Sequence, residues 1–326
     1  MQRLMCLFYL LVFSGGIGCS QKNSILDSSA IYLADPTIFN HDGTYYLYGT
    51  TGDPKFKDKL GFLVYTSKDL KTWEGPKGAT DGLALKKGDA FGDEGFWAPQ
   101  VFEYGAKFYI AYTANEHIAM ATADSPLGPF INPSKEDLKA PVKQIDPFVF
   151  FDDDGKKYLY HVRLTEGNRI FVAELNDDLL SIKQETLTEC LSGNLQWENT
   201  QNADWSVTEG PTVLKHNKLY YLIYSANDFR NPDYAVGYAT SNSPLGPWKK
   251  SNNSPIIRRE LLGINGTGHG DVFMNKYGQL QYIMHTHFND STVHPRRTAI
   301  VKVDFAKVEN GTDVFKIDKR TFRFIE

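Results

Sequence analysis

One pattern recurs five times along the 326-residue chain: an apolar strand, a tight turn, and a second strand rich in Tyr, Leu and Ile. Strong turn signals such as Asp42-Gly43 and Asp154-Gly155 join the two strands of a copy. The copies lie roughly 50 to 65 residues apart and begin at Asp35, Pro99, Asp146, Pro211 and His269. A repeat of this kind predicts five similar antiparallel units.

Each hairpin is followed by a further strand pattern, such as "FLVYTS" at 62–67 and "HIAMATA" at 117–123. Units of three or four antiparallel strands, with almost no helical periodicity, predict an all-β fold, a five-bladed β-propeller. A β-sandwich is the alternative, but it does not explain why the hairpin has a fixed place in every unit. We expect residues 31–326 to form one propeller domain, because no linker or low-complexity stretch follows residue 30.

The N-terminus reads as an export signal rather than as part of the fold. Residues 1–18 hold Arg3, an apolar run from Leu4 to Phe13 and a small-residue end, and the run is too short to span a bilayer. Cys19 follows directly and resembles the lipidated first residue of a bacterial lipoprotein, although Gly16 stands where Leu or Val is usual. A plain secretory signal is the alternative. We expect residues 19–30 to be a short tether and the protein to be lipid-anchored in a bacterial cell envelope, with no other membrane contact.

Composition limits the partners. The net charge of −4 is spread without long runs, so no basic stripe predicts binding of nucleic acid. The 21 Phe, 18 Tyr and 5 Trp residues are mostly core material, although sugar-binding clefts also use exposed rings as platforms. Cys190 is the single cysteine in the body of the mature chain, so no internal disulfide is expected. We expect a monomer.

The residues at the starts of the five copies meet at one mouth if the fold is a propeller, because the first strand of each blade lines the axis. They are Asp35, Trp97, Asp146, Glu209 and His269. Taken alone, Asp35 beside Pro36 reads as a solvated turn residue. Three carboxylates on one axis repel one another, however, and burial disfavours their charge. Such a cluster predicts cation binding or acid–base chemistry.

Four motifs resemble glycoside hydrolase family 43 when taken in order: "ADPTIF", "WAPQV", "DPFVFFDDDGKKYLY" and "TEGPTVLKHNKLYYLIYSA". The resemblance covers about residues 30–326 and implies a five-bladed propeller that hydrolyses arabinosides and xylosides with inversion. It implies that Asp35 is the general base, Glu209 the general acid, and Asp146 the carboxylate that raises the pKa of the acid and orients it. Inversion needs a base and an acid about 6.5 to 9.5 Å apart, with water between them. No cofactor is required for that chemistry.

The same resemblance implies that His269 faces a hydrated metal, often calcium, on the axis. Because Ca²⁺ prefers oxygen ligands, such an ion would be held mainly through water, and a core histidine is the alternative. Trp97 is a candidate sugar platform, Trp205 and Phe229 are candidates for leaving-group subsites, and Arg296 is a candidate for contact with a sugar hydroxyl. Core packing is the alternative for Trp97, and ordinary surface positions are the alternative for the other three.

These features predict a glycosidase of the α-L-arabinofuranosidase or β-D-xylosidase type, acting on plant-type polysaccharides or oligosaccharides. The alternatives are a β-galactofuranosidase, an endo-arabinanase, or a non-catalytic glycan-binding propeller of the cell envelope. Intact carboxylates at all three matching positions argue against the last of these. A closed pocket at the mouth would indicate exo action, and an open groove would indicate endo action.

Overall fold

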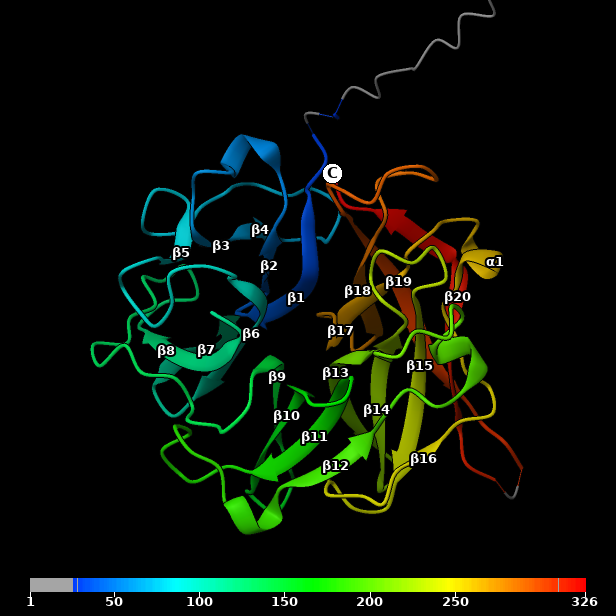
Figure 1. Cartoon of the computed structure of the whole chain (residues 1–326). Coiled ribbons are helices and arrows are strands. Elements are labelled where there is room, and N and C mark those ends of the chain that lie inside the picture. The colour runs from blue at the N-terminus through cyan, green and yellow to red at the C-terminus, as the bar shows by residue number, and fades with distance from the viewer. Residues whose placement is uncertain (1–25, 28, 310) are drawn as a thin grey trace, which may run out of the picture.

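The computed structural model describes residues 26, 27, 29–309 and 311–326 (Figure 1). The predicted leader at 1–18, the lipidation site Cys19 and the first part of the tether at 19–30 lie outside the described residues. Their assignments therefore stay predictions.

The predicted five-bladed propeller is confirmed, since the described residues form five antiparallel sheets of three or four strands around one axis (Figure 1). Blade one holds β1 (Leu33–His41), β2 (Thr44–Thr51) and β4 (Tyr65–Ser67). Blade two holds β6 (Trp97–Tyr104), β7 (Lys107–Ala114) and β8 (His117–Ala123). Blade three holds β9 (Gln144–Phe151), β10 (Lys157–Leu164), β11 (Asn168–Glu174) and β12 (Thr188–Leu191).

The last two blades have the same order from the axis outward. Blade four holds β13 (Thr208–His216), β14 (Leu219–Ala226), β15 (Ala235–Ser241) and β16 (Lys249–Lys250). Blade five holds β17 (Gly268–Met274), β18 (Leu280–Thr286), β19 (Arg297–Ala306) and β20 (Val314–Phe324). Helical structure in the described part of the chain is limited to α1 (Arg259–Leu262) and to 3₁₀ turns at Pro54–Phe56, Gln184–Thr186 and Gln196–Glu198.

The strand predicted at 62–67 is divided in two. β4 pairs with β2, as predicted, but β3 (Gly61–Leu63) pairs with β5 (Leu83–Lys86) in a separate two-stranded sheet. Val64 lies between β3 and β4 and is hydrogen-bonded to the connection that leads to blade two: its N–H donates to the carbonyl of Gly82, and its carbonyl accepts the N–H of Lys77. The division therefore comes from the long connection between blades one and two.

The two ends of the propeller domain close the ring between blades five and one (Figure 1). The N–H of Ile31 donates to the carbonyl of Ile325 at 3.3 Å, and the N–H of Ile325 donates to Thr298 at 3.0 Å. The Thr298 hydroxyl also donates to the carbonyl of Leu33 at 2.9 Å. Ring closure removes a free edge and fixes β1, which carries the first site residue.

Aromatic side chains fill the wedges between neighbouring blades. Phe62, before blade two, and Tyr112, on β7, are fully buried, and their ring centroids lie 5.6 Å apart in an edge-to-face arrangement. Tyr160 and Trp248 make a similar contact between blades three and four. The aromatic content is thus largely core, as expected. Within the described range we find no helix that is both long and apolar enough to cross a membrane.

Candidate active site

β-Bulges at the starts of the inner strands set the direction of the three predicted carboxylates. The register of β1 against β2 shifts between Ala34 and Thr37, and similar shifts occur in blades three and four. Asp35 has φ 48° and Asp146 has φ 56°, a left-handed conformation that aspartate tolerates better than most residues. Bulges of this kind re-aim a side chain next to a site. Both aspartates are buried, so neither is a solvated turn residue.

Hydroxyl groups of neighbouring blades hold the bulges in place. Thr50 Oγ1, on blade one, accepts the N–H of Ala98 at 3.0 Å and donates to Asp35 Oδ2 at 2.7 Å. Thr113 Oγ1, on blade two, accepts the N–H of Asp146 at 3.0 Å. Each of these blades therefore fixes the bulge of the next one. The sequence reasoning missed both threonines, whose signal was a threonine in the next-to-last position of the second strand of the hairpin.

A pocket of about 530 Å³ opens at this end of the axis. All eight predicted site residues within the described chain line it: Asp35, Trp97, Asp146, Trp205, Glu209, Phe229, His269 and Arg296. Trp97 is 37% exposed and Trp205 is 49% exposed, so the indole rings of both residues are available to a ligand. The structure thus brings the eight together, and their individual roles stay predictions.

Asp35 lies in the most cationic part of the pocket. Arg296 donates from Nη1 to Asp35 Oδ1 at 3.1 Å, and its guanidinium lies 4.6 Å from the centroid of the Phe229 ring. His285 Nδ1 lies 3.3 Å from the same oxygen and accepts the Asp35 N–H. Burial would raise the pKa of Asp35, but the charges of Arg296 and His269 outweigh it and hold the pKa well below its usual value. The Asp35 carboxylate is therefore ionised at neutral pH.

Asp146 and Glu209 have the opposite electrostatic environment. Burial first, and then the charge of Asp35, raise the pKa of Asp146 to about 7. Burial first, and then the charge of Asp146, raise the pKa of Glu209 to about 7. The Gly210 N–H donates to Asp146 Oδ2 at 3.1 Å and favours the ionised form of that carboxyl. The two carboxyls titrate as a coupled pair, which retains a proton near neutral pH.

Two residues that the sequence reasoning missed hold Glu209 in position. Tyr234 donates its hydroxyl to Oε1 at 2.8 Å, and Asn168 donates its amide to Oε2 at 3.0 Å. The indole N–H of Trp205 donates to Asn168 Oδ1 at 2.8 Å, which fixes the orientation of that amide with its NH₂ toward Glu209. Neither Tyr234 nor Asn168 belongs to a motif that would have singled it out.

His269 lies between two carboxylates, with Nδ1 3.5 Å from Asp35 Oδ1 and 3.6 Å from Asp146 Oδ2. No group of three or more His, Cys, Asp or Glu side chains suited to a metal ion occurs among the residues with described positions. A cavity of about 20 Å³ beneath the pocket, lined by His269, Gln100 and Asp271 among others, has room for about one water molecule. A calcium ion takes about six to eight ligands, so this cavity does not fit the hydrated ion that the resemblance implies. We derive no step through a metal, and axial calcium stays a prediction.

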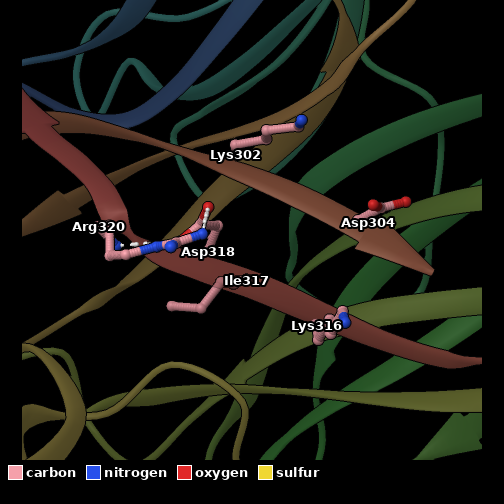
Figure 2. A pocket seen from close by; sticks show the side chains of 6 residues that line it. All are labelled: Lys302, Asp304, Lys316, Ile317, Asp318 and Arg320. Carbon is pink, nitrogen blue, oxygen red and sulfur yellow. Dashed lines mark hydrogen bonds and ion pairs between the residues drawn. The ribbon is translucent and has the colours of Figure 1, made fainter. Parts of the chain in front are cut away.

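A separate depression of about 350 Å³ lies over β19 and β20, on the outer part of blade five (Figure 2). Its side chains are mostly charged, and Arg320 is already paired with Asp318 at 2.9 Å. Figure 2 shows Lys302 and Lys316 set apart from that pair. None of the predicted site residues lines this depression, so the candidate chemistry belongs to the axial pocket.

Known proteins similar to this chain are enzymes of carbohydrate hydrolysis. A crystal structure of an endo-1,4-β-xylanase from Bacteroides thetaiotaomicron has 43% identity and a TM-score of 0.80, covering 89% of this chain and 95% of that one. A thermostable family-43 glycoside hydrolase has 34% identity and a TM-score of 0.75, covering 88% of this chain and 92% of that one.

Two further similar enzymes are named for other sugars than xylose. A β-D-galactofuranosidase of Aspergillus niger is 27% identical, over 84% of this chain and 80% of that enzyme. An arabinoxylan arabinofuranohydrolase of Bacillus subtilis is 27% identical over 66% of this chain, which spans about half (48%) of that enzyme. The model of glycosyl hydrolases family 43 matches residues 25–311. The chain therefore belongs to glycosyl hydrolases family 43.

Proposed function

We propose that this protein is an inverting glycosidase that removes arabinofuranosyl or xylosyl residues from plant-type polysaccharides or oligosaccharides. The observation that carries the proposal is the electrostatic contrast within one pocket. Asp35 is held ionised by Arg296, whereas Glu209 keeps a proton near neutral pH because it is buried beside Asp146. A base and an acid with pKa values pushed apart are what hydrolysis of a glycosidic bond requires.

The steps follow from that contrast. Asp35 accepts a proton from a water molecule as the water oxygen attacks the anomeric carbon. Glu209 gives its proton to the leaving oxygen as the glycosidic bond breaks. Asp146, whose Oδ2 accepts the Gly210 N–H, holds negative charge near Glu209 and raises its pKa. Exchange with solvent then returns a proton to Glu209 and removes one from Asp35.

The released sugar is the finer part of the proposal. The Bacteroides thetaiotaomicron and Bacillus subtilis enzymes are named for xylan and arabinoxylan, which supports a pentose substrate. A β-galactofuranosidase is the second candidate, because the Aspergillus niger enzyme of that name aligns with 84% of this chain. Trp97 and Trp205 serve in either case as stacking surfaces at the mouth of the pocket.

A substrate panel tests the proposal. Aryl α-L-arabinofuranoside, β-D-xyloside and β-D-galactofuranoside are compared with arabinoxylan, arabinan and galactan oligosaccharides, and product size is recorded. Proton NMR of the best reaction in its first minutes, before mutarotation, gives the anomer that forms first. We expect release of a pentose with inverted configuration. A retained anomer would contradict the role of Asp35, because a retaining site has its carboxylates only about 5 to 5.5 Å apart and uses one as a nucleophile.

We also propose that the enzyme is anchored to a bacterial cell envelope through Cys19. The support is the sequence alone: an apolar run that ends in small residues directly before that cysteine. A Cys19→Ser variant should lose labelling by fatty acid and leave the membrane fraction. Equal labelling of the variant and the natural chain would contradict the anchor.

A further inference from the structure

A second cavity, of about 600 Å³, lies next to the catalytic pocket over blade four, and we call it the amide cavity. One wall is the loop before β13, which turns at 199–202, where the N–H of Asn202 donates to the carbonyl of Asn199. The residues of this loop that line the cavity are Asn199, Gln201, Ala203, Trp205 and Val207. Asp204 lies between two of these positions, is exposed and does not line the cavity. The loop therefore has one face toward the cavity and another toward solvent.

The loop is braced by its own hydrogen bonds. The Asn199 side chain donates to the carbonyl of Ala203 and accepts the N–H of Ala203, both at 2.9 Å. Gln201 is exposed and makes no side-chain hydrogen bond to any residue that the structure describes. A fixed wall that offers a free carboxamide and an indole face suits a ligand with hydroxyl groups and an apolar ring face.

The charges at the cavity cancel. Asp228 and Arg230 are the charged residues among the described residues that line it, and Arg230 Nε donates to Asp228 Oδ1 at 2.7 Å. Each of the two charges therefore already has an opposite partner at the cavity. The lining therefore favours a neutral ligand over an anionic one.

The amide cavity lies on the acid side of the catalytic pocket. Trp205, Val207, Asp228 and Arg230 line both spaces. Trp205 is also joined to Glu209 through Asn168, by hydrogen bonds of 2.8 and 3.0 Å. A general acid faces the leaving oxygen, so the part of the substrate beyond that oxygen would pass over Trp205 into the amide cavity.

We propose that the amide cavity is a subsite for the leaving-group side of the substrate, occupied by further neutral sugar units of an oligosaccharide or polysaccharide. This inference rests on the proposed glycosidase function and extends it. The enzyme would prefer a sugar carried on a chain to the same sugar carried on a small aglycone. Binding energy from these remote units then contributes to kcat/KM.

The test fills the cavity without changing the catalytic pocket. Ala203→Trp places an indole on the cavity face, and Asp204→Trp places the same side chain on the solvent face as the matched control. We expect Ala203→Trp to lower kcat/KM at least about tenfold on the preferred oligosaccharide and to change it less than about twofold on the aryl glycoside of the same sugar. Asp204→Trp should change neither. Gln201→Trp is the second filling variant if thermal melting shows that Ala203→Trp is unfolded.

Equal losses on both substrates, or no loss on the oligosaccharide, would overturn the subsite. A separate binding measurement keeps this result distinct from failure of the proposed function. Calorimetry with an Asp35→Asn background, which should turn over substrate about 10²- to 10⁴-fold more slowly, measures affinity for the same panel of neutral oligosaccharides. If the Asp35→Asn protein binds an oligosaccharide and loses that affinity when Ala203→Trp is added, the subsite is supported even if no hydrolysis is found. If the Asp35→Asn protein binds no oligosaccharide in the panel, the subsite is overturned.

Discussion

Replacing Asp146 by asparagine should move the alkaline limb of the pH–activity profile to lower pH. Asparagine keeps an oxygen that can accept the Gly210 N–H, which donates to Asp146 Oδ2 at 3.1 Å. The substitution therefore removes the negative charge while leaving the bulge with its hydrogen bond. Because that charge helps Glu209 to keep its proton, Glu209 should ionise at a lower pH in the variant.

The size of the effect follows from the environment of Glu209. Its pKa is raised from 4.5 to about 7, with burial as the largest cause and Asp146 as the next. Removing the second cause should lower the pKa by about one pH unit, which corresponds to about 1.4 kcal/mol. Burial remains, so the pKa should stay above 4.5. Arg296 still pairs with Asp35 and keeps its pKa well below the usual value, so Asp35 should give no acid limb within the pH range of the assay in either enzyme.

The assay is kcat/KM between about pH 4 and pH 9 on an aryl glycoside, since that ratio reports the free enzyme. Asp153→Asn is the matched control, because Asp153 is an exposed acid in the β9–β10 turn, at the end of β9 remote from Asp146. An alkaline limb that stays in place, or that moves to higher pH, would refute the coupling between Asp146 and Glu209. A limb that stays in place would mean that Asp146 does not contribute to the pKa of Glu209.

Two further results are expected. Asp35→Ala should lower kcat by about 10²- to 10⁴-fold, the usual cost of losing a general base, and a near-normal rate would remove Asp35 from the mechanism. Asp146→Asn should be more stable than the natural chain above pH 7. The folded pKa of Asp146 is raised from 3.8 to about 7, so the stability it contributes is present below about pH 4 and is lost as the pH rises through 7. Thermal melting at pH 5 and pH 8 measures this, with a gain at pH 8 of about 1 kcal/mol or more; a gain confined to pH 5 would contradict it.

The fold was predictable because its signals are local. Turn residues and strand patterns lie next to one another in sequence, and their repetition fixed the number of blades. The carboxylates were predictable for a related reason: Asp35, Asp146 and Glu209 stand at matching places in the repeat, so the topology alone brings them to one mouth. The prediction of one continuous strand at 62–67 was wrong. Val64 forms its hydrogen bonds with a long connection that is not part of the repeat, so the strand is interrupted there.

The partners of the carboxylates could not be predicted, because they depend on how neighbouring blades pack. Asn168 begins β11 in blade three and reaches Glu209 in blade four, and Tyr234 reaches the same carboxyl from the loop before β15. His285 contacts Asp35 across the junction of blades five and one. None of these contacts follows from the spacing of the residues within one hairpin.

A single departure from the repeat connects the packing of the blades to the chemistry. The N–H at four of the five bulges is accepted by a residue near the end of the second strand of the preceding blade: Thr50, Thr113, Ser225 or His285. In blade three the matching residue is Val162, which pairs with Ile145 and has no side-chain atom that could accept a hydrogen bond. The N–H of Gly210, at the fourth bulge, donates instead to the carboxylate of Asp146. Blade three, which lacks a side-chain acceptor at Val162, is thus the blade that supplies Asp146. The hydrogen bond from Gly210 to Asp146 therefore does two things: it satisfies the N–H of the fourth bulge, and it holds the Asp146 carboxylate beside Glu209, whose pKa that carboxylate raises.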